Sequence, residues 1–149
     1  MYRNIEQTWQ KVTKESYGDI RARAILWRKD RAIVRVDRPA KLQRARALGY
    51  KAKMGFVVVR VRVGRGGMRR KRPVSGRRPK HLGVTRMRAE VNMQQVAERR
   101  AIEKYPNLEF LGSYFVHKDG KYLWHEVIMV DPLSAPVASD KNLKKTLPE

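Results

Sequence analysis

One stretch of the sequence carries most of the side chains that could do chemistry, and these side chains are cations. Between Arg38 and Ala89 there is no aspartate or glutamate, but there are eighteen lysines and arginines. Thirteen of the eighteen are arginine, whose planar guanidinium can hold a phosphate through two hydrogen bonds and can stack on an exposed base. A carboxylate beside a phosphate costs Coulomb energy. We therefore interpret residues 38–89, hereafter the acid-free segment, as a surface for nucleic acid.

The overall charge supports this interpretation. The 149 residues include 35 Lys and Arg against 14 Asp and Glu, a formal net charge of +21. An ordinary solvated surface mixes both signs, whereas such an excess repels itself until a polyanion relieves it. The simplest alternative for a short run of charged residues is a solvent-exposed tail that binds nothing. It fits poorly here, because the acid-free segment is continuous with a predicted helix and strand.

The candidate binding residues are the cations of the acid-free segment together with one tyrosine and one histidine. Tyr50, between Gly49 and Lys51, could stack on a base or pack in the core, and the sequence leaves both open. The full candidate set is Arg38, Lys41, Arg44, Arg46, Tyr50, Lys51, Lys53, Arg60, Arg62, Arg65, Arg69, Arg70, Lys71, Arg72, Arg77, Arg78, Lys80, His81, Arg86 and Arg88.

The sequence shows no pattern of residues typical of a catalytic or metal-binding site. The histidines His81, His117 and His125 are scattered, and the chain has no cysteine. His125 lies in an apolar run, which favours a packed or hydrogen-bonded side chain. The glycines of residues 64–67 lack the Gly-Lys-Ser/Thr of a phosphate-binding loop. We expect no catalytic residue, no metal and no cofactor. The apolar runs are far shorter than the ~20 residues that span a bilayer, so we expect no membrane partner.

Apolar periodicity and breaker residues predict the elements of the first half. Asn4 with Gln7 has the spacing of a capping box, and Ser16 with Asp19 resembles a second helix start. A strand over 31–37 should follow, and then a short helix after Pro39 that ends at Gly49.

Residues 55–63 give the clearest strand pattern. One face is expected to carry Val57, Val59, Val61 and Val63. The opposite face changes from Phe56 and Val58 to Arg60 and Arg62. We therefore expect this strand to begin inside the protein and to end facing a negatively charged partner.

Residues 64–90 show neither helical nor strand periodicity, which predicts a long irregular and basic loop. A helix capped by Asn92 and Gln95 should follow, with Pro106 ending it. Strands over 108–117 and 121–130 should then form a hairpin around Asp119-Gly120.

A two-residue turn at Asp119-Gly120 would pair Phe115 with Trp124 and Val116 with Leu123. Both faces of the second strand are apolar, so helices should cover both sides of the sheet. From Pro132 onward we expect an extended tail. The predicted fold is α+β, a mixed or antiparallel sheet of about four strands with helices on both faces. Residues 1–132 would form a single domain and residues 133–149 the tail.

Three blocks of this sequence closely resemble the archaeal and eukaryotic large-subunit ribosomal protein family L-fifteen-e. They are "RPAKLQRARALGYKAKMGFVVVRVRVGRGG" (38–67), "GRRPKHLGV" (76–84) and "QQVAERRAIEKYPNLEFLGSYFVHKDGKYLWHEVIMVDP" (94–132). The resemblance runs from about residue 17 to residue 132. It implies a small domain lodged on rRNA, with basic segments matching 38–53 and 64–88 in contact with the RNA.

The resemblance further implies a structural role without catalysis, partners among large-subunit rRNA and neighbouring ribosomal proteins, and a cytoplasmic location. Family members usually continue past the equivalent of Pro132 into a basic tail. Residues 133–149 depart from that pattern, so we expect the RNA contacts of such a tail to be absent. The first helix is also less basic than is usual in the family.

Charge alone also permits two other functions. An RNA-processing enzyme would need a carboxylate or histidine cluster, which the sequence does not display. A DNA-compacting protein would need only the charge, and should hold duplex DNA as well as structured RNA. The resemblance favours neither.

Overall fold

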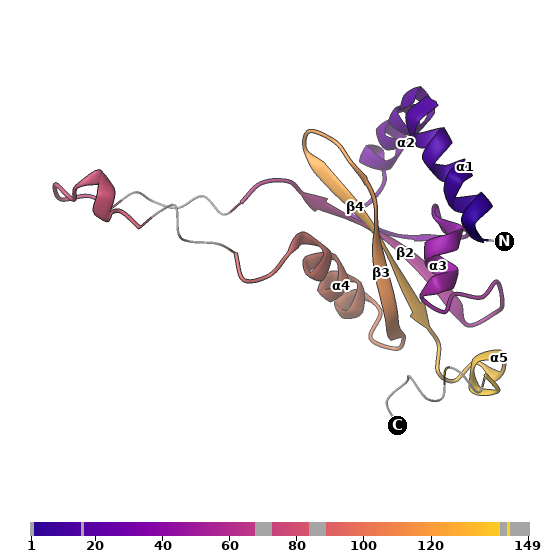
Figure 1. Cartoon of the computed structure of the whole chain (residues 1–149). Helices are drawn as coiled ribbons and strands as arrows, with labels where there is room; N and C mark the ends of the chain where they lie inside the picture. Colours follow the sequence, from indigo (N-terminus) through magenta and orange to yellow (C-terminus); the bar gives the residue numbers. More distant parts are fainter. Residues whose placement is uncertain (1, 16, 68–72, 84–88, 141–142, 144–149) are drawn as a thin grey trace.

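The structure is a computed structural model of the chain, and it describes every residue except 1, 16, 68–72, 84–88, 141–142 and 144–149. The expected α+β fold is confirmed (Figure 1). In chain order the elements of the described part are α1 (Tyr2–Glu15), α2 (Tyr17–Lys29), β1 (Ile33–Val36), α3 (Leu42–Ala47), β2 (Phe56–Gly64), η1 (Pro79–His81, a 3-10 turn), α4 (Met93–Lys104), β3 (Glu109–Lys118), β4 (Tyr122–Val130) and α5 (Ala135–Ala138).

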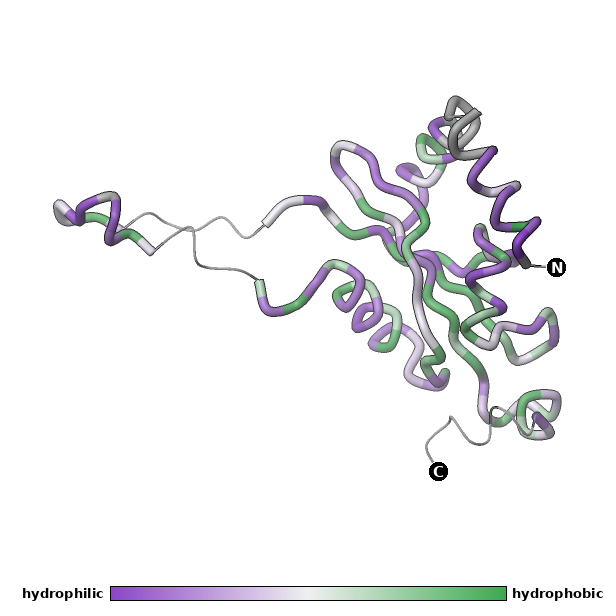
Figure 2. The backbone as a smooth tube through the Cα atoms, in the orientation of Figure 1, coloured by the Kyte–Doolittle hydropathy of each residue, from purple (hydrophilic) through white to green (hydrophobic). Residues whose placement is uncertain are grey.

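The four strands form one antiparallel sheet in the order β1-β2-β4-β3. The two long central strands, β2 and β4, pair along their whole length from Phe56 opposite Val130 to Gly64 opposite Tyr122. Hydrophobic residues run along both of them (Figure 2). β3 therefore forms one edge of the sheet, and no described strand pairs with its outer side.

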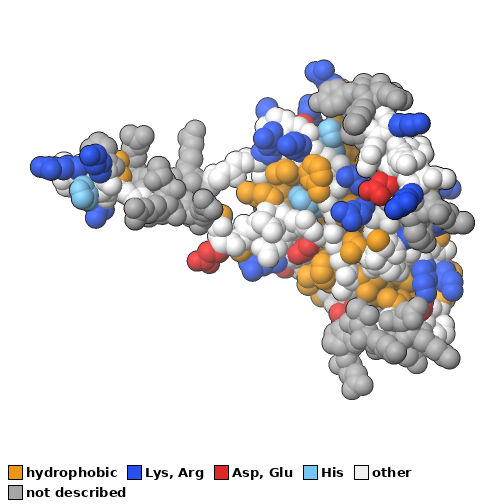
Figure 3. Space-filling model, in the orientation of Figure 1, with side chains coloured by type: hydrophobic (Ala, Val, Ile, Leu, Met, Phe, Trp, Pro, Cys, Tyr) orange, Lys and Arg blue, Asp and Glu red, His pale blue; other side chains and the backbone are white. Residues whose placement is uncertain are grey.

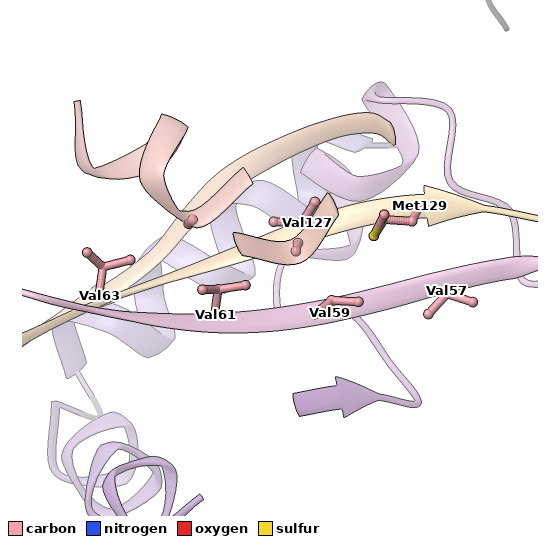
Figure 4. Packing of buried hydrophobic residues seen from close by; sticks show 8 residues of the cluster. Val57, Val59, Val61, Val63, Val127 and Met129 are labelled. Carbon is pink, nitrogen blue, oxygen red and sulfur yellow. The ribbon is translucent and has the colours of Figure 1, made fainter. Parts of the chain in front are cut away.

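The alternation predicted for residues 55–63 is confirmed, because Val57, Val59, Val61 and Val63 all face α4. Val127 and Met129 of β4 join them, and Ala97 and Ala101 of α4 close the cluster (Figure 4). The predicted start of α4 is also confirmed. The Asn92 side chain accepts from the Gln95 N–H at 2.8 Å, and the Gln95 side chain accepts from the Asn92 N–H at 3.0 Å.

The opposite face of the sheet lies under α2 and α3. Trp124 and Ile128 of β4 pack there with Tyr114 and Val116 of β3. One alanine from each helix, Ala24 and Ala45, is buried against them. Two apolar faces on one strand thus produce the two covered sides that the sequence predicted.

The predicted register of the β3–β4 hairpin is wrong. Phe115 lies opposite His125, and His117 lies opposite Trp124. The connection has three residues, because the Asp119 carboxylate accepts from the backbone N–H groups of Lys121 (2.7 Å) and Tyr122 (2.5 Å). Irregularities between Phe110 and Gly112, and between Phe115 and His117, shift the pairing further.

The predicted extended conformation after Pro132 is wrong for the residues of α5. Val137 is buried and packs with Leu143 against Phe56 and Val130. The helix can approach this closely because Gly55 has no side chain: a Cβ there would lie 2.6 Å from both Ser134 Oγ and Val137 Cγ2. Helix α5 and Leu143 therefore pack against the start of β2.

The predicted capping box at Asn4 is also wrong. Helix α1 begins at Tyr2, so Asn4 lies in its first turn, and its carbonyl accepts from the Thr8 hydroxyl at 2.8 Å. Ser16, proposed as a second helix start, lies outside the described residues, and α2 begins one residue later. Among the described helices none has the length and apolar character needed to cross a membrane.

Candidate nucleic-acid interface

A buried carboxylate holds the beginning of the acid-free segment against the sheet. Glu126 of β4 is only 1% exposed. Its Oε2 accepts from the Ala40 backbone N–H at 2.9 Å and from the Tyr114 hydroxyl at 2.5 Å. Burial raises the pKa of the Glu126 carboxyl, while the two hydrogen bonds and the charges of Arg60 and Lys41 oppose that rise. Glu126, which lies outside the acid-free segment, thus holds the first residues of that segment in place on the sheet.

Helix α3 then turns its two arginines to the solvent. Gln43 and Ala45 are buried beneath the helix, whereas Arg44 and Arg46 are exposed. Gly49, at φ +94°, takes the left-handed conformation that suits the residue after the helix C-terminus. The predicted short helix with a buried side and a cationic side is confirmed, although the burial of Gln43 was not expected.

Lys41 occupies a more protected position at the start of the same helix. Its ammonium donates to the Phe115 carbonyl at 2.8 Å and lies 5.6 Å from the ring centre of Trp9 and 5.3 Å from that of Phe115. Burial lowers the pKa of Lys41, and the neighbouring charge of Arg44 lowers it further. Two cations therefore sit close together with one buried carboxylate, Glu126, partly offsetting them.

Of the candidate RNA-binding residues in the loop between α3 and β2, one packs in the core and the others lie nearer the surface. Tyr50 is half-buried and meets Phe56 edge to face at 6.0 Å between ring centres, so the packing alternative describes its position. Lys51 forms an ion pair with Asp140. Arg38 and Lys53 are exposed. Base stacking by Tyr50 stays a prediction.

Arg60 and Arg62, at the end of β2, contact the protein itself. Arg60 pairs with Asp30 at 2.9 Å, and its guanidinium lies 4.6 Å from the ring centre of Trp27. Arg62 donates to the backbone carbonyls of Trp27 and Arg28, and lies over Tyr122. The negative groups that these side chains face are thus an aspartate and carbonyls of α2 and the residue that follows it.

Arg65 fixes the root of the long loop. Its backbone N–H donates to the Lys121 carbonyl at 2.7 Å, and its guanidinium donates to the Asp119 carbonyl at 2.6 Å. Arg28 of α2 pairs with the Asp119 carboxylate at 2.7 Å. The β3–β4 turn therefore sets the direction in which the acid-free segment leaves the sheet.

The tip of the loop, residues 73–83, stands away from the sheet (Figure 1). It presents exposed Arg77, Arg78, Lys80 and His81, and Figure 3 shows basic side chains gathered there. A turn with Ser75 at φ +70° and Gly76 at φ +65° precedes η1. The remaining candidates lie outside the described residues; they are Arg69, Arg70, Lys71, Arg72, Arg86 and Arg88.

The remaining titratable side chains form no metal-binding group in the described part of the chain, because no three His, Cys, Asp or Glu come together there. His125 is buried, as expected for a packed residue, and burial lowers its pKa; neither ring nitrogen has a hydrogen-bond partner among the described residues. The sequence analysis did not identify Glu126, which positions residues at the start of the acid-free segment. The one signal for its burial is strand alternation, which places it on the same face of β4 as Trp124 and Ile128.

Comparison with protein families identifies a relative of this chain. The family model described as Ribosomal L15 matches residues 1–147. The match extends on both sides of the blocks, from about residue 17 to residue 132, that carried the resemblance.

Proposed function

We propose, on the premise that this chain belongs to the L-fifteen-e family of large-subunit ribosomal proteins, that its acid-free segment binds and stabilises the rRNA of that subunit. Membership makes the chain a structural ribosomal protein. The proposal adds the residues that would do the binding, the absence of catalysis of its own, and a place in the cytoplasmic ribosome beside neighbouring ribosomal proteins.

One observation carries the proposal: the exposed cations of the segment lie where a phosphate backbone can reach them, and no acid of the segment competes. Arg38, Arg44 and Lys53 are exposed around α3, while Arg77 and Arg78 are exposed at the loop tip. Arg60, Arg62 and Arg65 have protein partners and would position the others. Sequence-independent phosphate contacts of this kind fix position rather than read bases.

The test compares two pairs of adjacent arginines. Arg77 and Arg78 belong to the acid-free segment, whereas Arg99 and Arg100 are exposed on α4 among glutamates. The double variants R77Q/R78Q and R99Q/R100Q change the net charge equally. We expect R77Q/R78Q to weaken binding to large-subunit rRNA and to flatten the slope of log affinity against log salt by about 1.8, from ~0.9 per duplex phosphate. R99Q/R100Q should leave the slope unchanged.

Equal losses in the two variants would mean that net charge alone drives binding, which would contradict the proposal. A competition with duplex DNA separates the DNA-compacting alternative, because such a protein would hold duplex DNA as tightly as rRNA. Cleavage or modification of the RNA during the same titration would instead support an enzyme.

A further inference from the structure

A pocket of about 420 Å³ opens at the free edge of the sheet, between α3, the first turn of α4 and β3. Its size falls in the range of small-ligand sites, ~300–1,000 Å³. Lys41 and Arg44 line one side and Gln94 lines the other, with Ser113 and Phe115 of β3 between them. The charged residues that line the pocket are therefore both cations, and the rest of its lining is polar, aromatic or aliphatic. The nearest acid in contact with the lining is Glu98, which accepts from the Ser113 hydroxyl at 2.5 Å.

The positive side is available to an anion. Arg44 is exposed, and its guanidinium makes no hydrogen bond or ion pair with any described residue. Among the described residues the Lys41 ammonium makes one hydrogen bond, to the Phe115 carbonyl, although it has three protons to donate. A phosphate placed between these two cations would relieve their mutual repulsion.

The rest of the pocket suits a planar, polar ring. Phe115 is 38% exposed, and the Lys41 ammonium lies 5.3 Å from its ring centre. A base would stack on the part of the ring that Lys41 leaves open. The Gln94 amide donates to the carbonyl and hydroxyl oxygens of Ser113, at 3.3 and 2.6 Å. That orientation leaves its own carbonyl oxygen without a partner in the described residues, ready to accept from a donor on a base.

An added β-strand from another protein fits this edge poorly. Gln94 and Lys41 already occupy the outward carbonyls of Ser113 and Phe115. The two irregularities of β3 also break the regular spacing that a neighbouring strand needs.

We propose that this edge pocket takes one unstacked nucleotide of single-stranded RNA, with its phosphate against Arg44 and Lys41 and its base on Phe115. The inference rests on the RNA-binding function proposed above, and it adds the kind of RNA that this side of the domain recognises. Stacking of exposed bases on aromatic side chains is the usual way in which proteins recognise single strands.

The test fills the pocket without altering any charge. Ala47 lines it, at the exposed end of α3, so Ala47→Leu should exclude the nucleotide. Ala52→Leu is the matched control, because Ala52 is equally part of the acid-free segment and exposed, but does not line the pocket. The probes are an oligouridylate and an RNA duplex of the same length, titrated against the full chain.

We expect Ala47→Leu to weaken oligouridylate binding about tenfold, the effect of losing one stacked base, and to leave duplex binding unchanged. Ala52→Leu should change neither. Phe115→Leu provides a second variant that removes the ring and should reproduce the selective loss, with thermal unfolding of each variant as a check on the fold.

Oligouridylate binding as tight in both pocket variants as in the wild type would overturn the pocket assignment, while intact duplex binding would leave the proposed function standing. Failure of the wild type to bind either RNA would instead contradict the proposed function. If Ala47→Leu spares RNA binding but releases another protein from isolated large subunits, the pocket belongs to a protein partner, and the nucleotide assignment is wrong.

Discussion

Gly55→Ala is expected to destabilise the domain by about 2.5–6 kcal/mol. Gly55 has φ +89°, where any residue with a Cβ is strained by ~1–3 kcal/mol. The new methyl group would also overlap Ser134 and Val137, each 2.6 Å away, so α5 would have to move. Val137 would then lose its burial, which contributes roughly 1.5–3 kcal/mol for a valine-sized side chain. Urea unfolding measures the total.

Gly49→Ala is the control that isolates the packing contribution. Gly49 has a similar φ of +94°, but a Cβ there meets nothing within 4 Å. That variant should lose only the strain. Equal destabilisation by the two substitutions would show that α5 does not pack on β2 in solution.

Glu126→Leu is expected to lower the free energy of unfolding by about 2–6 kcal/mol. The leucine would leave both the Ala40 N–H and the Tyr114 hydroxyl without their acceptor. Each buried donor without a partner costs ~1–3 kcal/mol. Because Ala40 precedes α3, the same change should also loosen the attachment of the cations of that helix. Unfolding by urea and rRNA affinity are the two measurements.

Glu126→Gln separates hydrogen bonding from charge. A glutamine oxygen can still accept from both donors, so the loss should be much smaller than with leucine. A cost close to that of the leucine variant would mean that the carboxylate charge, and not its acceptor geometry, holds residues 38–41 in place.

The difference in stability between the wild type and Glu126→Gln is expected to depend on pH. Burial raises the pKa of Glu126 above its usual 4.5, so the folded protein retains a proton that the unfolded chain has lost. The stabilising contribution of this group is therefore complete below pH 4.5 and is lost as pH rises through the raised pKa. The free energy of unfolding of the wild type, relative to that of Glu126→Gln, should therefore fall as the pH rises from 4.5 through the raised pKa of Glu126. A difference that stays constant with pH would contradict this expectation.

Local patterns predicted the parts of the fold that depend on near neighbours. The valines of β2 and the Asn92–Gln95 cap of α4 follow from strand alternation and from a contact three residues apart. The register of the hairpin could not be predicted, because the chain bulges between Phe115 and His117 and Asp119 folds a three-residue turn. Neither feature changes the apolar pattern on which the prediction rested.

The candidate site was predictable as a charge pattern but not as an arrangement. Which arginines face outward depends on where distant groups lie: Arg60 meets Asp30 from thirty residues away, and Arg62 meets carbonyls near the end of α2. Packing of α5 depends on Gly55, which looks in the sequence like any glycine before a strand. Glu126, the anchor of residues 38–41, acts across 86 positions of sequence.

Crosslinking in intact large subunits tests the central claim most directly. Photoreactive residues placed at Arg77 and, in a separate protein, at Arg99 compare the tip of the acid-free segment with the mixed-charge surface of α4. The electrostatic account predicts abundant crosslinks to rRNA from the first position and far fewer from the second. Abundant crosslinks from position 99 together with none from position 77 would contradict the electrostatic account.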